Sequence, residues 1–225
     1  MLISIHIPKT GGTTFQTLLE NAFGSGCFFD YAANPTKKGY FRDVCDAYLF
    51  RFSKSQPPSS TRCIHGHFFA LKYTHVREAQ FATWVRNPLQ LVPSLYFFWK
   101  RHPEVADRHP LCKRMHQDNM TLEEFAALPH LWNIQTKFLT GVSIRRLHFV
   151  GLTEEYEKGV HLFKKTFTLS DRVYFATMNS NPEKRSEYQL SSKLKSDLSR
   201  WNSKDMSLYE KGRLRFVELC RKYNV

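Results

Sequence analysis

The chain has 225 residues, of which 42% are apolar, 15% aromatic and 24% charged, and its formal net charge is +13. This composition excludes a disordered chain and fits a globular protein with a real core, residues 1–225 forming one domain. The excess of positive charge indicates an anionic partner: nucleic acid, a sulfated or carboxylated glycan, an anionic lipid surface or a highly charged cofactor.

The cysteines and the distribution of apolar residues indicate the redox state and the cellular compartment of the protein. No two cysteines have CxxC spacing, and their number is odd: Cys27, Cys45, Cys63, Cys112 and Cys220. We therefore expect reduced thiols rather than a zinc site or a disulfide framework. No stretch is apolar enough to span a membrane, and the first residues lack the pattern of a secretory signal. A cytoplasmic protein is expected, unless the chain is a domain excised from a longer one.

The predicted elements alternate between short apolar strands and amphipathic helices. The first strand is LISIHI at residues 2–7, closed by Pro8, and a helix over 15–23 follows, capped by Thr13 or Thr14. Further strands are expected at residues 62–68, 80–86, 147–154 and 173–177, and further helices at 41–52, 88–102, 121–128, 130–141, 154–167 and within 191–223. This alternation predicts a three-layer α/β/α fold around a central parallel sheet, with a P-loop-like strand-loop-helix at its start.

The segment PKTGGTT lies where the first strand ends and the first helix begins. Such a loop surrounds a concave site with backbone N–H groups, and the helix N-terminus adds partial positive charge. The donors expected in this oxyanion cradle are Lys9, Thr10, Gly11, Gly12, Thr13 and Thr14. The lysine precedes both glycines, so the nucleotide-triphosphate order GxxxxGK[ST] is absent, as is GxGxxG. A plain tight turn at the two glycines is the alternative interpretation.

The loop HIPKTGGTTF resembles the 5′-phosphosulfate loop of sulfotransferases that use 3′-phosphoadenosine 5′-phosphosulfate (PAPS). It looks closest to the branch that contains heparan sulfate 2-O-sulfotransferase and bacterial relatives. In that family an arginine at a strand end and a serine in the following helix bind the 3′-phosphate. The segment TWVRNPLQLVPSLYFFW supplies Arg86 and Ser94 at matching positions. An arginine fork suits a phosphate dianion, although a solvated arginine before an Asn-Pro turn is the alternative.

Weaker likenesses extend the resemblance over most of the chain, in WNIQTKFLTG, VGLTEEYEKG, NSNPEKRSEYQLS and WNSKDMSLYEKGRLRF. The resemblance implies that Lys184 and Arg185 close over the cofactor phosphates, as a basic late loop does in relatives. An exposed basic loop is the alternative. PAPS is thus the expected sulfuryl donor, and the family's transfer needs no metal.

The segment HGH offers a candidate base. His65 and His67 bracket Gly66 at the end of a predicted strand, and positions two apart in a strand face the same side. The resembling branch carries a matching HGH with catalytic histidines. We expect His67 to be the general base, with His65 assisting acceptor binding or orientation, and Lys9 to meet the leaving oxygen. A pair of core or metal-binding histidines is the alternative; His6, in the first strand, is expected to be a packed residue with a hydrogen bond.

Two other functions compete with sulfuryl transfer to an acceptor hydroxyl, the acceptor being expected on a saccharide. A kinase-like phosphotransferase would need a Walker lysine and magnesium ligands, which are not visible. A noncatalytic polyanion-binding module would use basic pairs such as Lys100-Arg101 and Arg145-Arg146, but gives HGH no role. The charge favours an anionic polysaccharide as acceptor, and nucleic acid is not expected. The sequence does not indicate an oligomeric state.

Overall fold

The computed structural model describes residues 1–31, 40–53, 57–170, 173 and 187–225. Within this part of the chain, five parallel strands form one sheet in the order β2-β3-β1-β4-β5. The strands are β1 (Leu2–Ile5), β2 (Cys27–Phe29), β3 (Cys63–Gly66), β4 (Gln80–Val85) and β5 (Phe149–Leu152). The predicted α/β class with a central parallel sheet is confirmed.

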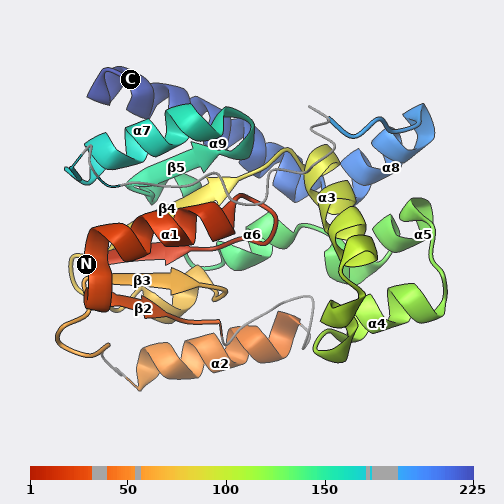
Figure 1. The fold of residues 1–225 in the computed structure, drawn as a ribbon, viewed down its shortest axis with the longest axis horizontal. Helices are drawn as coiled ribbons and strands as arrows, with labels where there is room; N and C mark the ends of the chain where they lie inside the picture. The colour runs from red at the N-terminus through yellow and green to blue at the C-terminus, as the bar shows by residue number, and fades with distance from the viewer. Residues whose placement is uncertain (32–39, 54–56, 171–172, 174–186) are drawn as a thin grey trace.

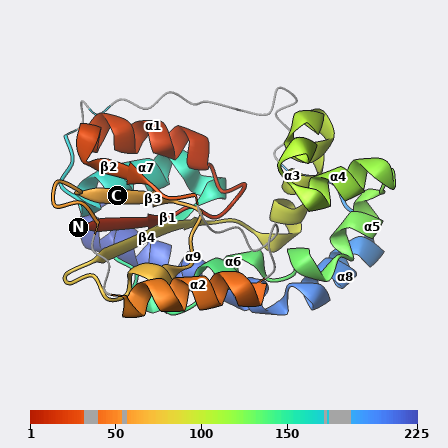
Figure 2. The ribbon, with the colours of Figure 1, turned by 90° about the horizontal axis from the view of Figure 1, so that it is seen from below.

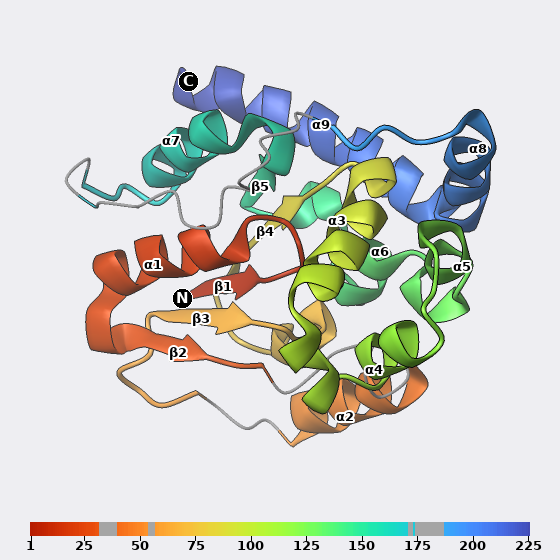
Figure 3. The same ribbon diagram turned by 45° about the vertical axis from the view of Figure 1, so that its right-hand side comes forward.

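Helices cover both faces of this sheet (Figure 1). Figure 2 shows α1 (Gly12–Phe23) and α7 (Tyr156–Thr166) on one face, and α2 (Tyr40–Phe52), α6 (Ile134–Phe138) and α9 (Ser203–Tyr223) on the other. The remaining helices are α3 (Pro88–Arg101), α4 (Pro110–Gln117), α5 (Leu122–Ala126) and α8 (Ser192–Trp201). They gather beyond the carboxyl ends of the strands (Figure 3). Short 3₁₀ turns lie at Gly24–Gly26, Ala70–Tyr73, Pro103–Asp107, Pro129–Leu131, Ile144–Arg146 and Thr153–Glu155.

Aromatic side chains join α1 and α7 to the sheet. The ring of Phe15 in α1 meets Trp84 of β4 at 5.5 Å and Phe163 of α7 at 4.7 Å between centroids, both edge-to-face. Another neighbour of Trp84 is Tyr156, the first residue of α7, whose ring stacks on it at 4.4 Å. Edge-to-face and offset pairs of this kind are favourable beyond the area they bury. They bring the first turn of α7 beside the loop that precedes α1.

The strand order places that loop at a switch point of the sheet. β1 is the central strand and pairs with β3 on one side and β4 on the other. From β1 the chain passes outward to β2, returns to β3, and then crosses to the opposite side of β1. In open α/β sheets, ligands bind outside the carboxyl ends of the strands at such a point.

The predicted strands at residues 2–7, 62–68, 80–86 and 147–154 are confirmed with narrower bounds. β2 has three residues and was not predicted, since so short a run gives no clear period. The strand predicted at residues 173–177 lies outside the described residues, except Val173, which is in no strand.

Most predicted helices are also present. The capping box at Thr121 and Glu124 is confirmed, because each backbone N–H bonds the other residue's side chain. The helix predicted over 130–141 is reduced to a 3₁₀ turn and the short α6, since Asn133 takes a left-handed φ of 54° between them. α4 was not predicted. Within the described part, no helix is both long enough and apolar enough to cross a membrane.

Candidate active site

The loop between β1 and α1 brings the backbone N–H groups of a helix start to the switch point. Gly11 is the residue before α1, and no side chain caps the first turn of the helix. The N–H groups of a first helical turn have no partner within the helix and carry partial positive charge. Thr10 is buried and its hydroxyl donates to the Ile7 carbonyl at 2.8 Å, which ties the loop to the end of β1. Thr13 is exposed, whereas Thr14 is buried.

Both glycines of the loop are required by their neighbours. Gly11 has φ 85°, a left-handed conformation, and a Cβ there would lie 2.5 Å from Cε2 of Tyr156. The Tyr156 hydroxyl donates to the Gly11 carbonyl at 3.1 Å. A Cβ on Gly12 would lie 1.6 Å from Nε2 of His6. The loop is thus held between a tyrosine and a histidine, which is more than a plain tight turn needs.

Three cations, Lys9, Arg86 and Arg101, lie at this edge, and the carboxylate of Glu154 acts on Arg86 from a distance. Nζ of Lys9 rests 3.9 Å from the centroid of the Phe98 ring in α3, a cation–π contact. Burial, with the charges of Arg86 and Arg101, lowers the pKa of Lys9 to about 8. Within the described part of the chain, none of the three forms a salt bridge. An anion bound here would relieve both the repulsion and the lost solvation.

The guanidinium of Arg86 joins two of the predicted segments. Its Nη1 atom donates to the Ser94 hydroxyl at 2.8 Å and to the Lys9 carbonyl at 3.0 Å. Burial lowers the pKa of Arg86. The structure therefore brings the strand-end arginine and the helix serine, which are 8 residues apart, together with the first loop, 77 residues before the arginine.

A buried network that the sequence analysis missed holds the backbone of Arg86. Gln135 accepts from the Arg86 N–H at 2.9 Å and donates to the Arg86 carbonyl at 2.8 Å. The carboxylate of Asp205 in turn accepts from the N–H of Gln135 at 2.9 Å and from the N–H and hydroxyl of Thr136 at 2.7 and 2.6 Å. Burial raises the pKa of Asp205 although these donors oppose the shift. The segments WNIQTK and WNSKD carried a family likeness, but no local pattern pairs them.

Three imidazoles lie beside the loop. The ring of His6 stacks on His65 at 5.1 Å and on His67 at 4.4 Å between centroids, with interplanar angles of 14° and 25°. His65 and His67 therefore face the same side of the sheet, as two-residue spacing in a strand predicts. Phe15 of α1 meets His65 at 5.9 Å, so this is the α1 face.

His67 is arranged as a proton acceptor. Its Nδ1 lies 2.7 Å from the His6 carbonyl oxygen, which can only accept, so Nδ1 carries the ring proton. Nε2 is then the free basic nitrogen, and the side chain is half-buried rather than enclosed. Burial lowers the pKa of His67 to about 4, opposed by the hydrogen bond to His6. Tyr31, 44% exposed, meets this ring edge-on at 4.9 Å; it follows β2, and sequence reasoning did not find it.

His65 is enclosed, with 1% of its surface exposed. Its Nδ1 is 2.9 Å from the Ser4 hydroxyl, and its Nε2 has no hydrogen-bond partner within the described residues. Burial, with the charge of His67, lowers its pKa to about 3. So placed, the ring has no surface with which to touch an acceptor, and it contributes to the site by packing against His6.

The late basic loop with Lys184 and Arg185 lies outside the described residues. The chain that follows it is fixed at Tyr188, whose N–H donates to Gln90 Oε1 at 2.7 Å and whose ring stacks on Phe97 at 5.2 Å. Both contacts are with α3, the helix that carries Ser94. Among the described residues, no group of three or more potential metal ligands comes together.

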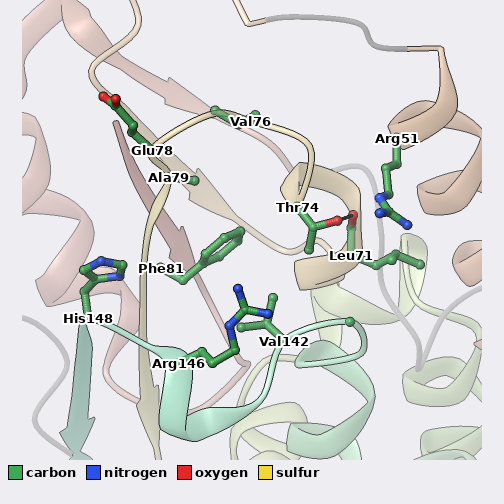
Figure 4. Close-up of a pocket in the computed structure, with 11 residues that line it drawn as sticks. Arg51, Leu71, Thr74, Val76, Glu78, Ala79, Phe81, Val142, Arg146 and His148 are labelled. Carbon is green, nitrogen blue, oxygen red and sulfur yellow. Dashed lines mark hydrogen bonds between the residues drawn. The ribbon is translucent and has the colours of Figure 1, made fainter.

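A cavity of about 410 Å³ opens elsewhere, at the amino ends of β4 and β5 (Figure 4). Its described lining includes Phe81 and His148, and Figure 4 shows the guanidinium groups of Arg51 and Arg146 directed toward it. It lies at the opposite end of the strands from the loop and contains none of the predicted site residues that the structure describes. We therefore place the candidate site at the carboxyl edge.

The chain was compared with protein families, curated proteins and solved structures. No protein-family model and no curated protein matches the chain. The crystal structure of a sulfotransferase from Alicyclobacillus acidocaldarius is similar to it with a TM-score of 0.48 and 14% sequence identity, covering 93% of this chain and 94% of that one. A likeness at this level identifies neither the family nor the activity of this chain.

Proposed function

We propose that the protein is a PAPS-dependent O-sulfotransferase that resembles the heparan sulfate 2-O-sulfotransferase branch. The observation that carries the proposal is the Arg86 guanidinium, which contacts both the Ser94 hydroxyl and the carbonyl of Lys9 in the glycine loop. Two anion-binding segments joined in this way suit a nucleotide with phosphates on both sides of its ribose. A single phosphate would need only one of them.

The residues present fit such a ligand. The uncapped first turn of α1 and Lys9 would hold the 5′-phosphosulfate, and Arg86 with Ser94 the 3′-phosphate. Bound PAPS supplies the sulfuryl group. Lys9 brings positive charge toward the leaving oxygen, and its partly desolvated ammonium makes that charge more effective than it is in water.

His67 would accept the proton of the acceptor hydroxyl at Nε2. Its Nδ1–H bond to the His6 carbonyl holds the ring in the correct tautomer for this task. A base with a pKa of about 4 in the free protein is a weak one at neutral pH, but a polyanionic ligand beside it would raise that pKa on binding.

We also propose that the acceptor is a saccharide hydroxyl, and favour an anionic polysaccharide. The cations Lys9, Arg86 and Arg101, none of which forms a salt bridge within the described residues, support an anionic acceptor as well as an anionic donor in a chain of net charge +13. Tyr31 beside His67 adds an exposed aromatic face against which a sugar ring could pack.

Binding and transfer test the proposal separately. Calorimetry should detect 3′,5′-ADP (PAP, the desulfated product), whereas ATP with magnesium should give no comparable binding. In assays with radiolabelled PAPS and a panel of heparan-type oligosaccharides, His67→Ala should lose transfer by about 10²- to 10⁴-fold and keep its affinity for PAP. His161→Ala is the matched control, because this histidine is exposed on α7.

Three results would count against the proposal. Preferential binding of ATP–magnesium would indicate a phosphotransferase. Steeply salt-dependent DNA binding without affinity for PAP would indicate a polyanion-binding module. Full transfer activity in His67→Ala would leave sulfuryl transfer in place and remove His67 as the base.

A further inference from the structure

His6 stacks on both of the other imidazoles in the histidine cluster. Its ring centroid is 5.1 Å from that of His65 and 4.4 Å from that of His67. It follows the central strand β1, and its backbone N–H donates to the Gly66 carbonyl at 2.8 Å. The backbone that carries His6 is therefore fixed by the same sheet that carries the candidate base.

Two contacts connect His6 to the parts of the site on either side of it. Its carbonyl oxygen accepts from Nδ1 of His67 at 2.7 Å. A Cβ built on Gly12 would lie only 1.6 Å from Nε2 of His6, so the His6 ring leaves no room for a side chain at Gly12. One imidazole ring thus fills the space between the base and the first residue of α1.

The environment of His6 keeps its ring uncharged. The titratable groups that face it are His65 and His67 of the HGH segment, Lys9 of the loop and Tyr31 after β2. Burial first, and then the charges of His67, His65 and Lys9, lower the pKa of His6 well below its usual value. Its Nδ1 is buried and has no hydrogen-bond partner among the described residues, so simple packing does not explain a histidine here.

We propose that His6 is a positioning residue for the base: its ring fixes the spacing between His67 and the loop at Gly12 and shields His67 from water, beside the backbone carbonyl that sets the tautomer of His67. A neutral ring can stack on His67 both before and after that residue takes up a proton, whereas a second cation would oppose the uptake. The naming of His67 as a base rests on the proposed function. The contacts of His6 with His67 and Gly12 do not.

Nuclear magnetic resonance of the imidazole nitrogens tests the contact with His67 without any activity assay. Long-range ¹H–¹⁵N spectra report the tautomer and the titration of each ring. We expect the Nδ1–H tautomer of His67 in the wild type, in His6→Phe and in His6→Ala, because the backbone carbonyl at position 6 is present in all three. The pKa of His67 should stay near the same low value in His6→Phe, which keeps a ring at this position. In His6→Ala, water reaches His67, so its pKa should rise toward its ordinary value.

Steady-state kinetics of the two variants test whether His6 affects sulfuryl transfer. In His6→Ala, kcat should fall at least about tenfold while KM for PAPS changes by less than about threefold, and the acidic limb of the pH profile should move upward. His6→Phe should retain kcat within about threefold and the wild-type limb. A packing defect alone would lower the amount of folded protein and leave the limb in place.

A double variant tests the contact with Gly12. Gly12→Ala alone should weaken PAP binding at least about tenfold and lower the Tm, because the new Cβ displaces the His6 ring. In His6→Ala/Gly12→Ala the new methyl enters the vacated space, so PAP affinity and Tm should both recover relative to Gly12→Ala. The low kcat of His6→Ala should not recover.

The outcomes separate the two levels of inference. Unchanged titration of His67 in His6→Ala, the same change in His6→Phe as in His6→Ala, or strictly additive losses in the double variant would each overturn the positioning role. Absence of PAP binding and of transfer in the wild type would instead overturn the proposed function. In that case the resonance and Tm measurements would still decide whether His6 holds His67 and Gly12 in place.

Discussion

Nη1 of Arg86 lies 2.8 Å from Oγ of Ser94, so the two residues meet without any ligand between them. The guanidinium is therefore already oriented by the serine and by the carbonyl of Lys9 at 3.0 Å. An anion binding here would accept from the remaining N–H groups of the Arg86 guanidinium, whose orientation would not need to change. Preorganisation of this kind raises affinity by lowering the ordering cost.

The first prediction concerns this pair. Ser94→Ala should weaken PAP binding about five- to tenfold, the effect of one hydrogen bond to a charged group. Arg86→Lys should weaken it about 100-fold, since an ammonium cannot contact the serine, the loop and a phosphate together. Calorimetry measures both, with the exposed Arg77→Lys as control. Equal affinities for Arg86→Lys and the control would show that this arginine holds no phosphate.

The second prediction follows from the pKa of Lys9, which burial and two arginines lower to about 8. An anion raises this pKa, so binding at pH 8 should take up part of a proton, and affinity should fall as pH rises above 8. Calorimetry in buffers of different ionisation enthalpy measures the uptake. In Lys9→Arg the side chain stays charged at every pH tested, so this variant should bind PAP without proton uptake. An undiminished uptake in Lys9→Arg would assign the proton to another group.

The third prediction concerns Gln135, which pairs with both backbone groups of Arg86. Gln135→Leu leaves that N–H and carbonyl buried without partners, at a cost of about 1–3 kcal/mol in the free energy of unfolding. PAP affinity should fall as well, because the arginine is no longer held at the strand end. Urea unfolding and calorimetry measure the two effects. Wild-type affinity in a destabilised variant would show that the network serves stability alone.

The fourth prediction is acid destabilisation. The pKa of His65 is about 3 and that of His67 about 4 in the folded protein, both below the unfolded value of 6.5. The unfolded chain therefore binds more protons than the folded one. The free energy of unfolding should be at its full value above pH 6.5 and should decrease as pH falls toward the folded-state pKa values of the two histidines. For His65 the loss is about 2 kcal/mol at pH 5.

Urea unfolding at pH 7 and pH 5 checks whether the free energy of unfolding decreases as the pH falls. His65→Asn, which removes the enclosed titrating ring and keeps a polar side chain near Ser4, should show a smaller decrease between the two pH values than the wild type. An equal decrease would mean that other groups cause the acid sensitivity.

The fold class could be predicted because four strands are continuous apolar runs bounded by clear breakers, and helices with one apolar stripe lie between them. β2 could not, because its three residues gain their strand conformation only by pairing with β3. The break at Asn133 could not be predicted either, since its backbone and side chain form hydrogen bonds with four residues more than 60 positions away: Trp201, Asn202, Lys204 and Asp205. Such long-range contacts leave no local pattern.

Some residues of the candidate site could likewise be predicted from the sequence, and others could not. Lys9, Arg86, Ser94 and His67 follow strand ends or a helix start, and parallel topology brings such positions to one edge. The part played by His6 could not be predicted, because it depends on which strand lies beside which: β1 next to β3 places one ring against two others. Gln135 was missed for a related reason, since its partner is backbone rather than another side chain.

The central position of β1 has a consequence for the speed of recognition. The loop that follows it is tied down by Thr10 at Ile7 and by Tyr156 at Gly11, so the donor array needs no closing motion before a ligand enters. Association of an anionic nucleotide should then be governed by diffusion and long-range attraction. Its rate constant should decrease steeply with ionic strength, while the rate of dissociation changes little.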